Sequence, residues 1–145
     1  MYKLTIICVL LQLAQGAQYV KVALTEQVTV ESEPFTIPFD KVKLKIGGTY
    51  DSSAHKVEVM QSGKYYVESH VVVESEYPPV VEIMKESGDE QSVVASCDEL
   101  TDQRCKFGER LQLEKGDQIY VRVNSHADSP TTVLQSDTYL FVASI

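Results

Sequence analysis

KVEVMQSGKYYVESHVVV, residues 56–73 of the chain, has the composition and spacing of β-structure and not of a helix. After residue 64 its side chains alternate between two sets, Tyr65, Val67, Ser69 and Val71 in one and Tyr66, Glu68, His70 and Val72 in the other. Successive residues of a strand point to opposite faces of a sheet, so one face here is mostly apolar and the other is mixed. We therefore expect two strands joined by a tight turn at residues 61–63, the second of them lying over a core.

The same pattern continues on both sides of this segment. Runs rich in Val, Ile, Leu and aromatic residues alternate with Gly, Pro, Ser and Asp, and no segment has the period of a helix. Many short strands at near-regular spacing are typical of an antiparallel sandwich or barrel. The sequence therefore predicts an all-β domain in which a second sheet covers the first.

Two of the expected strands, residues 80–84 and 139–142, carry apolar groups on both faces. In a two-layer sandwich each sheet has one solvated face, so such strands indicate that the outer face of their sheet is covered. Oligomerisation would cover it. The alternative is a few scattered surface apolar side chains, which are common on monomers.

The length of 145 residues is that of one domain with a real core, and the formal net charge is −8. A strongly acidic chain is a poor partner for nucleic acids and for anionic membranes. It is compatible with divalent cations or with basic protein partners.

The first sixteen residues have the features of a signal peptide. Lys3 gives a basic start, residues 4–13 are an apolar run too short to span a bilayer, and small residues stand at 14 and 16. We expect cleavage after Gly16, a mature domain of residues 17–145, and secretion to the extracellular space without a membrane span. The alternative is a buried core strand.

Cleavage would remove Cys8 and leave Cys97 and Cys105. An even pair of cysteines in an oxidising compartment favours a disulfide over free thiols or a metal site.

The sequence contains no recognisable catalytic arrangement. His55, His70 and His126 lack metal-ligand spacing to one another or to cysteine. Ser125, His126 and Asp128 lie in one loop, whereas a catalytic triad draws its members from different elements. We expect a protein that binds and does not catalyse, although a fold alone never excludes an activity.

An ordered set of short motifs resembles one known family. The matching pieces are VTV at 28–30, IPFDKV at 37–42, GTYD at 48–51, GKYYV at 63–67, LQLEKGDQIYV at 111–121 and TYLF at 138–141. Together they resemble the globular head of complement component 1q, which belongs to the tumour-necrosis-factor-like superfamily. Met60 stands where the family usually has a proline and Thr138 where it has a glycine, and the chain has no Gly-X-Y collagen repeat.

The resemblance implies a ten-stranded antiparallel jelly-roll sandwich that assembles as a homotrimer. With the two-faced strands, it makes Tyr120, Tyr139, Val81 and Ile83 candidates for the subunit contact.

Some heads of this family bind Ca²⁺ near the threefold axis, which by the same match implies Asp98 and Asp102 as ligands, with Glu99 between them. In the alternative interpretation, Arg104 and Lys106 neutralise these carboxylates in a solvated loop.

The family implies a secreted recognition module whose loops bind microbial surface patterns, glycans or extracellular proteins. Two alternatives are a structural or calcium-associated component of an extracellular or biomineral matrix, and a cytokine-like ligand of a receptor.

Overall fold

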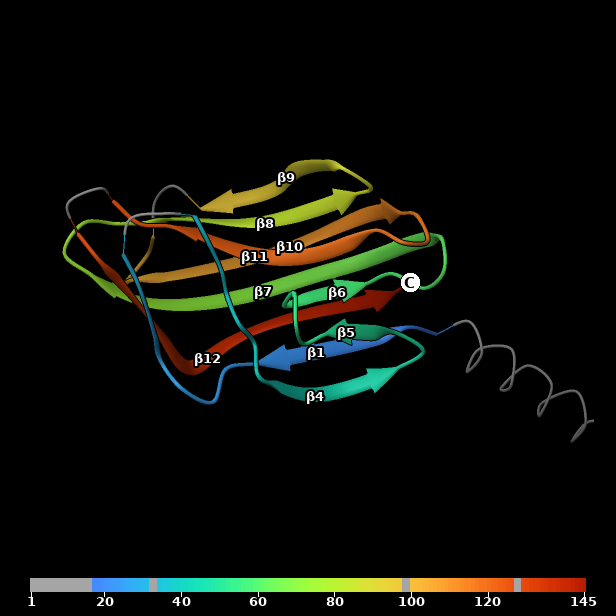
Figure 1. Ribbon diagram of the computed structural model, residues 1–145, viewed down its shortest axis with the longest axis horizontal. Helices are drawn as coiled ribbons and strands as arrows, with labels where there is room; N and C mark the ends of the chain where they lie inside the picture. Colours follow the sequence, from blue (N-terminus) through green and yellow to red (C-terminus); the bar gives the residue numbers. More distant parts are fainter. Residues whose placement is uncertain (1–16, 32–33, 98–99, 127–128) are drawn as a thin grey trace, which may run out of the picture.

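The computed structural model describes residues 17–31, 34–97, 100–126 and 129–145 (Figure 1). The predicted signal peptide, residues 1–16, lies outside this part of the chain. The described residues form strands, turns and loops, and no helix among them is long and apolar enough to cross a membrane.

The strands form two antiparallel sheets packed face to face. Sheet A has the order β10 (Arg104–Leu113), β7 (Gly63–Ser75), β12 (Thr131–Ser144), β1 (Tyr19–Ala23) and β4 (Lys41–Ile46), with β2 (Val28–Val30) paired to β12. Sheet B has the order β5 (Thr49–Asp51), β6 (Lys56–Glu58), β11 (Gln118–Asn124), β8 (Val80–Ser87) and β9 (Glu90–Cys97), with β3 (Phe35–Thr36) paired to β11. The predicted all-β jelly-roll sandwich is confirmed. Four of the twelve strands in the described residues are very short: β2, β5 and β6 have three residues each and β3 has two.

The core lies between the sheets and follows the predicted alternation. On β7 the side chains of Tyr65, Val67, Ser69 and Val71 are buried. Tyr65, Val67 and Val71 pack in one cluster with inward side chains of sheet B such as Ile119. Burying a large aliphatic side chain contributes about 1.5–3 kcal/mol relative to leaving it in water, so this layer supplies most of the driving force for folding.

The segment 56–73 forms two strands, but they do not pair with each other. β6 belongs to sheet B and β7 to sheet A, and residues 59–62 carry the chain from one layer to the other. Val59 holds this crossing in place: its amide donates to the carbonyl oxygen of Asp117 at 2.8 Å, and its carbonyl accepts from the amide of Gly116 at 2.8 Å. Gly116 has φ 95°, a left-handed conformation that favours glycine.

The two ends of the sandwich differ (Figure 1). Residue 17 and the C-terminus lie at one end, together with the β6–β7, β8–β9 and β10–β11 connections. The β7–β8, β9–β10 and β11–β12 loops gather at the opposite end, which we call the loop end. A partner that approaches the loop end therefore meets loops, and neither residue 17 nor the C-terminus.

Candidate interaction surface

The outer face of sheet A carries a group of aromatic side chains. In register, Tyr139 of β12 lies opposite His70 of β7, and Phe141 lies opposite Glu68. Tyr66, on the same face of β7, approaches Gly108 of β10 so closely that a Cβ there would lie 2.4 Å from the tyrosine oxygen. The side chains of all three aromatic residues are only partly buried.

Charged groups surround Tyr139 on this face. The Nζ of Lys21 lies 4.6 Å from the centre of its ring, a cation–π distance, and the ring of His70 lies 6.1 Å away. The Nδ1 of His70 lies 2.6 Å from the carbonyl oxygen of Asp137. Burial, together with the nearby carboxylate of Glu68, raises the pKa of Tyr139. Tyr139 therefore stays a neutral hydrogen-bonding group on a mixed aromatic and charged surface.

The outer face of sheet B is different, because the apolar side chains at its centre are already covered. Tyr120 and Met84 lie opposite each other on β11 and β8, yet only 3% and 2% of their surfaces are exposed. The Nζ of Lys56 lies 4.7 Å from the centre of the Tyr120 ring and 2.6 Å from the carboxylate of Glu86. Burial also raises the pKa of Tyr120.

A second ion pair covers the same face. The guanidinium of Arg122 lies 3.1 Å from the carboxylate of Glu82, on the next outward positions of β11 and β8. The two ion pairs flank Tyr120 and Met84 along the strands, so the centre of this face needs no partner to shield its apolar groups. At the edge of the sheet, Val93 of β9 lies opposite Met84 and is 47% exposed.

The four predicted contact residues thus fall in three environments. Tyr139 lies on the outer face of sheet A, and Tyr120 lies beneath an ion pair on the outer face of sheet B. Val81 and Ile83 point inward into the core, and none of their surface is exposed. Their assignment to a subunit contact is corrected by this placement, since a partner cannot reach them; the outward residues of β8 are instead Glu82 and Met84.

Lys21, Tyr66 and Phe141 also belong to this surface but were not predicted from the sequence. The alternation of the strands could have indicated two of them. Tyr66 follows the inward Tyr65 and so points outward, and Phe141, two residues after Tyr139, points to the same face as Tyr139. Lys21 reaches the surface only because β1 pairs with β12, a contact distant in sequence.

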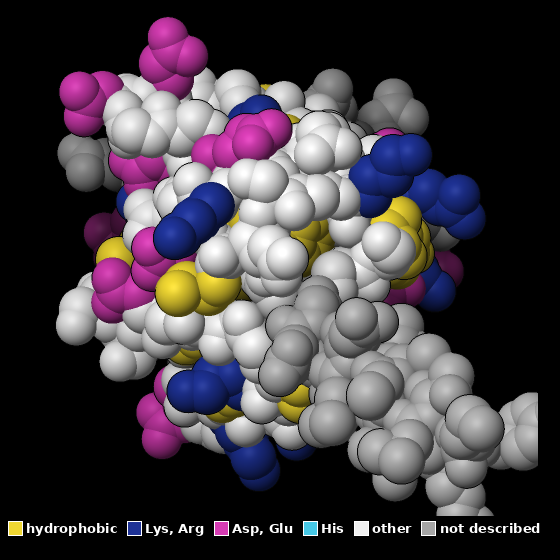
Figure 2. Space-filling model, turned by 90° about the vertical axis from the view of Figure 1, so that its right-hand side faces the viewer, with side chains coloured by type: hydrophobic (Ala, Val, Ile, Leu, Met, Phe, Trp, Pro, Cys, Tyr) yellow, Lys and Arg dark blue, Asp and Glu magenta, His cyan; other side chains and the backbone are white. Residues whose placement is uncertain are grey.

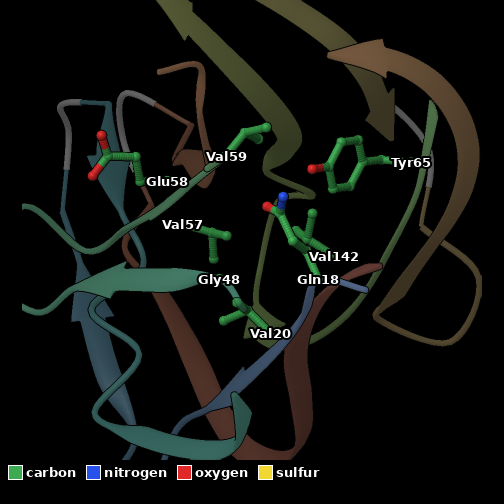
Figure 3. A pocket seen from close by; sticks show the side chains of 8 residues that line it. All are labelled: Gln18, Val20, Gly48, Val57, Glu58, Val59, Tyr65 and Val142. Atoms are coloured by element: carbon green, nitrogen blue, oxygen red, sulfur yellow. The ribbon is translucent and has the colours of Figure 1, made fainter. Parts of the chain in front are cut away.

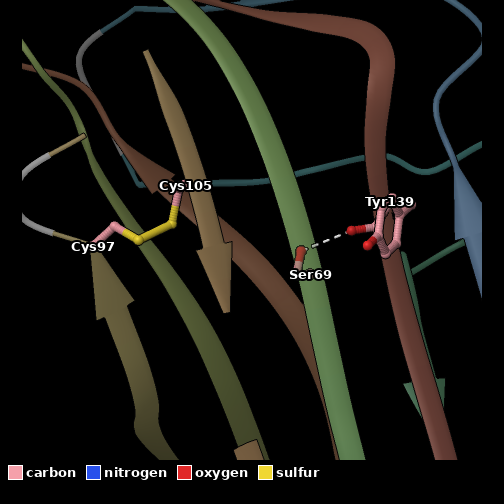
Figure 4. The surroundings of a disulfide bond; sticks show 4 residues. All are labelled: Ser69, Cys97, Cys105 and Tyr139. Atoms are coloured by element: carbon pink, nitrogen blue, oxygen red, sulfur yellow. Dashed lines mark hydrogen bonds between the residues drawn. A yellow bond between two sulfur atoms is a disulfide. The ribbon is translucent and has the colours of Figure 1, made fainter. Parts of the chain in front are cut away.

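The structure contains the predicted disulfide, between Cys97 and Cys105 (Figure 4). It joins the end of β9 in sheet B to the start of β10 in sheet A. Both strands are the last of their sheets on that side of the sandwich, so the bond ties the two layers together at an open edge. In the core nearby, the Ser69 hydroxyl donates to the carbonyl oxygen of Tyr139 at 2.8 Å (Figure 4).

Of the predicted calcium ligands, Asp98 and its neighbour Glu99 lie outside the described residues. Asp102 is exposed at the tip of a two-residue turn, with φ 52° there and φ 61° at Gln103, as a type I′ turn requires. Among the residues that the structure describes, no three His, Cys, Asp or Glu side chains form a group that could hold a metal ion. Calcium binding therefore stays a prediction.

Three hollows in the described part of the molecule are small or open. One of about 10 Å³ lies between the sheets beside Gln18 and Gly48 (Figure 3) and has room for about one water molecule. One of about 270 Å³ lies beside Lys64, Arg110 and Ile145, and one of about 200 Å³ lies beside Ser75 and Gln103 at the loop end. Binding through an exposed surface fits this molecule better than binding in a deep pocket.

Comparison with known structures identifies the fold. Eiger TNF from S. frugiperda is 14% identical with a TM-score of 0.68, covering 89% of this chain and 91% of its own. Murine APRIL at pH 8.5 is 16% identical with a TM-score of 0.70, covering 89% and 99%. Rabbit GITRL is 18% identical with a TM-score of 0.59, covering 88% and 93%. At these identities the similarity establishes a shared fold.

Comparison with sequences gives the family. No curated protein sequence matches the chain. The family model described as the C1q domain matches residues 20–141, which is most of the chain. The resemblance inferred from the ordered motifs is thereby confirmed, and the chain belongs to the C1q domain family.

Proposed function

We propose that this protein is an extracellular recognition module that acts as a homotrimer and performs no catalysis. The observation that carries the proposal is the contrast between the two outer faces. Sheet B covers Tyr120 and Met84 with its own ion pairs, whereas sheet A leaves Tyr66, Tyr139 and Phe141 partly open to water. Burying this aromatic surface against neighbouring copies would stabilise an assembly by roughly 25 cal/mol per Å² of apolar area.

A threefold arrangement follows from the family and suits this surface. In a ring of three copies each contact is heterologous, so the sheet A face of one subunit meets a different surface of the next. Three sheet A faces then turn inward, and the three loop ends point in the same direction. A trimer of this kind offers a ligand three equal loop ends, which multiplies weak contacts into stable binding.

The loop end is the proposed site of ligand contact. Tyr77 in the β7–β8 loop is 48% exposed, and its ring stacks on that of His126 in the β11–β12 loop, 5.0 Å between centroids. A stacked, exposed aromatic pair combines a flat apolar face with polar atoms at its edges, which suits a glycan or a protein surface.

A binding screen of the purified mature protein against glycans, bacterial surfaces, mineral particles and extracellular proteins, receptor ectodomains included, tests this function. The informative variant is Tyr77→Ala, and its matched control is Met60→Ala, because Met60 is 42% exposed at the opposite end of the sandwich. We expect binding that Tyr77→Ala weakens and Met60→Ala leaves unchanged. Equal loss in both variants, or no binding at all, would contradict the proposal. Binding only to mineral or only to receptor ectodomains would favour the matrix or the cytokine-like role.

A further inference from the structure

Strand β4, Lys41–Ile46 with the sequence KVKLKI, is exposed along its entire length. The exposed fractions of its aliphatic side chains are 47% for Val42, 40% for Leu44 and 47% for Ile46. Among the strands of the described chain it is the only one with no buried or half-buried residue. An alternating apolar strand normally buries one face, so this exposure calls for an explanation.

β4 is also a free edge of sheet A. Its one partner among the described strands is β1, and Figure 1 places it at the border of the molecule with no strand beyond it. An edge of this kind presents unpaired backbone N–H and C=O groups, which are a template for another strand.

Among the described residues, the lysines of β4 form no ion pair with a carboxylate. The two ion pairs of the described residues, Lys56–Glu86 and Arg122–Glu82, both lie on sheet B. Figure 2 shows Lys and Arg side chains beside hydrophobic ones at the lower border, the side on which Figure 1 places β4. On a chain with net charge −8, Lys41, Lys43 and Lys45 thus form a cationic edge next to exposed aliphatic groups.

These lysines oppose pairing of β4 with a second copy of itself. Two such strands side by side would bring lysines close to lysines, and like charges on neighbouring strands are destabilising. The register with β1 also shifts at Lys43, which has no partner residue there, and such an irregularity discourages edge-to-edge association. The same charges would attract a strand that carries carboxylates, so this edge discriminates between partners.

We propose that the free edge of β4 is a docking site for an extended acidic segment of a partner protein, which adds to sheet A as a further strand. The register shift at Lys43 leaves Leu44 and Ile46 on the outer face of sheet A, whereas Val42 lies opposite the inward Val22. The segment would alternate acidic and aliphatic residues, so that its aliphatic groups meet Leu44 and Ile46 and its carboxylates meet Lys43 and Lys45 on the other face. Backbone hydrogen bonds would give affinity for any added strand, and the side-chain contacts would give specificity for an acidic one. The aliphatic groups favour a peptide over a sulfated polysaccharide, which would use the lysines alone. The proposed docking site specifies the class of partner for the recognition role proposed above, on which it rests. Docking at β4 does not require the trimer.

The probe is an eight-residue, end-capped, fluorescent peptide of alternating glutamate and valine, and binding to the mature protein is measured by anisotropy. The informative variant is Lys41→Glu combined with Lys43→Glu and Lys45→Glu. The control, Lys64→Glu with Lys85→Glu and Lys115→Glu, makes the same change in net charge at residues outside β4. We expect the β4 variant to lose at least about tenfold in affinity, since two or three favourable charge pairs become repulsive, and the control to stay within about twofold.

Two further probes separate strand addition from charge attraction alone. The same peptide with N-methyl groups on alternate residues keeps its charge but loses the hydrogen bonds of one edge, so it should not bind. Equal affinity for the methylated peptide, equal loss in both protein variants, binding of heparin alone, or no binding of the unmodified peptide would each overturn the proposal. The mass of each variant in solution, measured in parallel, shows whether the protein is a trimer. Failure of the trimer proposal is thereby distinguished from failure of the β4 docking proposal.

Discussion

The hydroxyl of Tyr50 donates a hydrogen bond of 2.6 Å to the carbonyl oxygen of Phe39, at the margin of the core. Burial, together with the negative charges of Asp40 and Asp51, raises the pKa of Tyr50 above its usual range. The unfolded chain releases the tyrosine proton near pH 10, while the folded chain keeps it. The free energy of unfolding should therefore be insensitive to this group below about pH 10 and should fall as the pH rises further.

Tyr50→Phe tests this residue directly. At pH 8 the variant should lose about 1 kcal/mol of stability with the hydrogen bond, and between pH 8 and pH 11 its stability should fall less than that of the unaltered protein. Urea unfolding at both values measures the two effects. Tyr77→Phe, at an exposed position, is the control. An unchanged alkaline loss in Tyr50→Phe would contradict the role of Tyr50.

Asp98 and Asp102 remain the predicted ligands of Ca²⁺. If calcium binds there, millimolar calcium should raise the melting temperature by mass action, and Asp98→Ala with Asp102→Ala should abolish the increase. Scanning calorimetry with calcium, with magnesium and with chelator measures it. An increase that survives the double substitution excludes this site, and no increase in the unaltered protein excludes calcium binding.

Residue patterns distinguished inward from outward positions on β7 but could not tell the two tyrosine environments apart. Tyr120 and Tyr139 both stand at outward positions next to apolar residues. Whether such a side chain is shielded depends on partners from other strands, such as Lys56 over Tyr120, and these pairings are set by the tertiary fold.

At the scale of elements, the disulfide holds the last strands of the two sheets together. Cys97 and Cys105 enclose a short loop, with a sequence separation of 8. Removing the bond with Cys97→Ser and Cys105→Ser should lower the free energy of unfolding by about 2.5 kcal/mol on the chain-entropy model. Urea unfolding of the two forms gives the difference, and two alkylatable thiols in the native protein would contradict the bond itself.

The positions of the strands were predictable, but their pairing was not. A Gly-containing turn between two β-rich runs favours a hairpin, yet β6 and β7 belong to different sheets. The segment between them contains the buried Val59 and connects one sheet to the other, so it does not form a hairpin turn. In the same way the alternation at residues 41–46 predicts a strand, while its exposure follows from its place at the end of sheet A.

At the scale of the whole molecule, basic and acidic residues are unevenly distributed, although the net charge is negative. The strands of sheet A carry eight basic residues, Lys21, Lys41, Lys43, Lys45, Lys64, Arg104, Lys106 and Arg110, and four acidic ones, Glu68, Glu74, Glu109 and Asp137. The negative excess therefore resides in sheet B and the loops. A net charge describes the field far from the molecule, whereas a docked partner meets one face.

The trimer is the feature on which the proposed function depends most, and the mass of the mature protein in solution tests it most directly. Sedimentation equilibrium at micromolar concentration should give three times the mass of residues 17–145 for the unaltered protein. Phe141→Glu, which places a charge beside Glu68 on the outer face of sheet A, should give a folded monomer, and Met60→Glu should remain a trimer. A monomeric unaltered protein, or a trimer that persists in Phe141→Glu, would contradict assembly through this face.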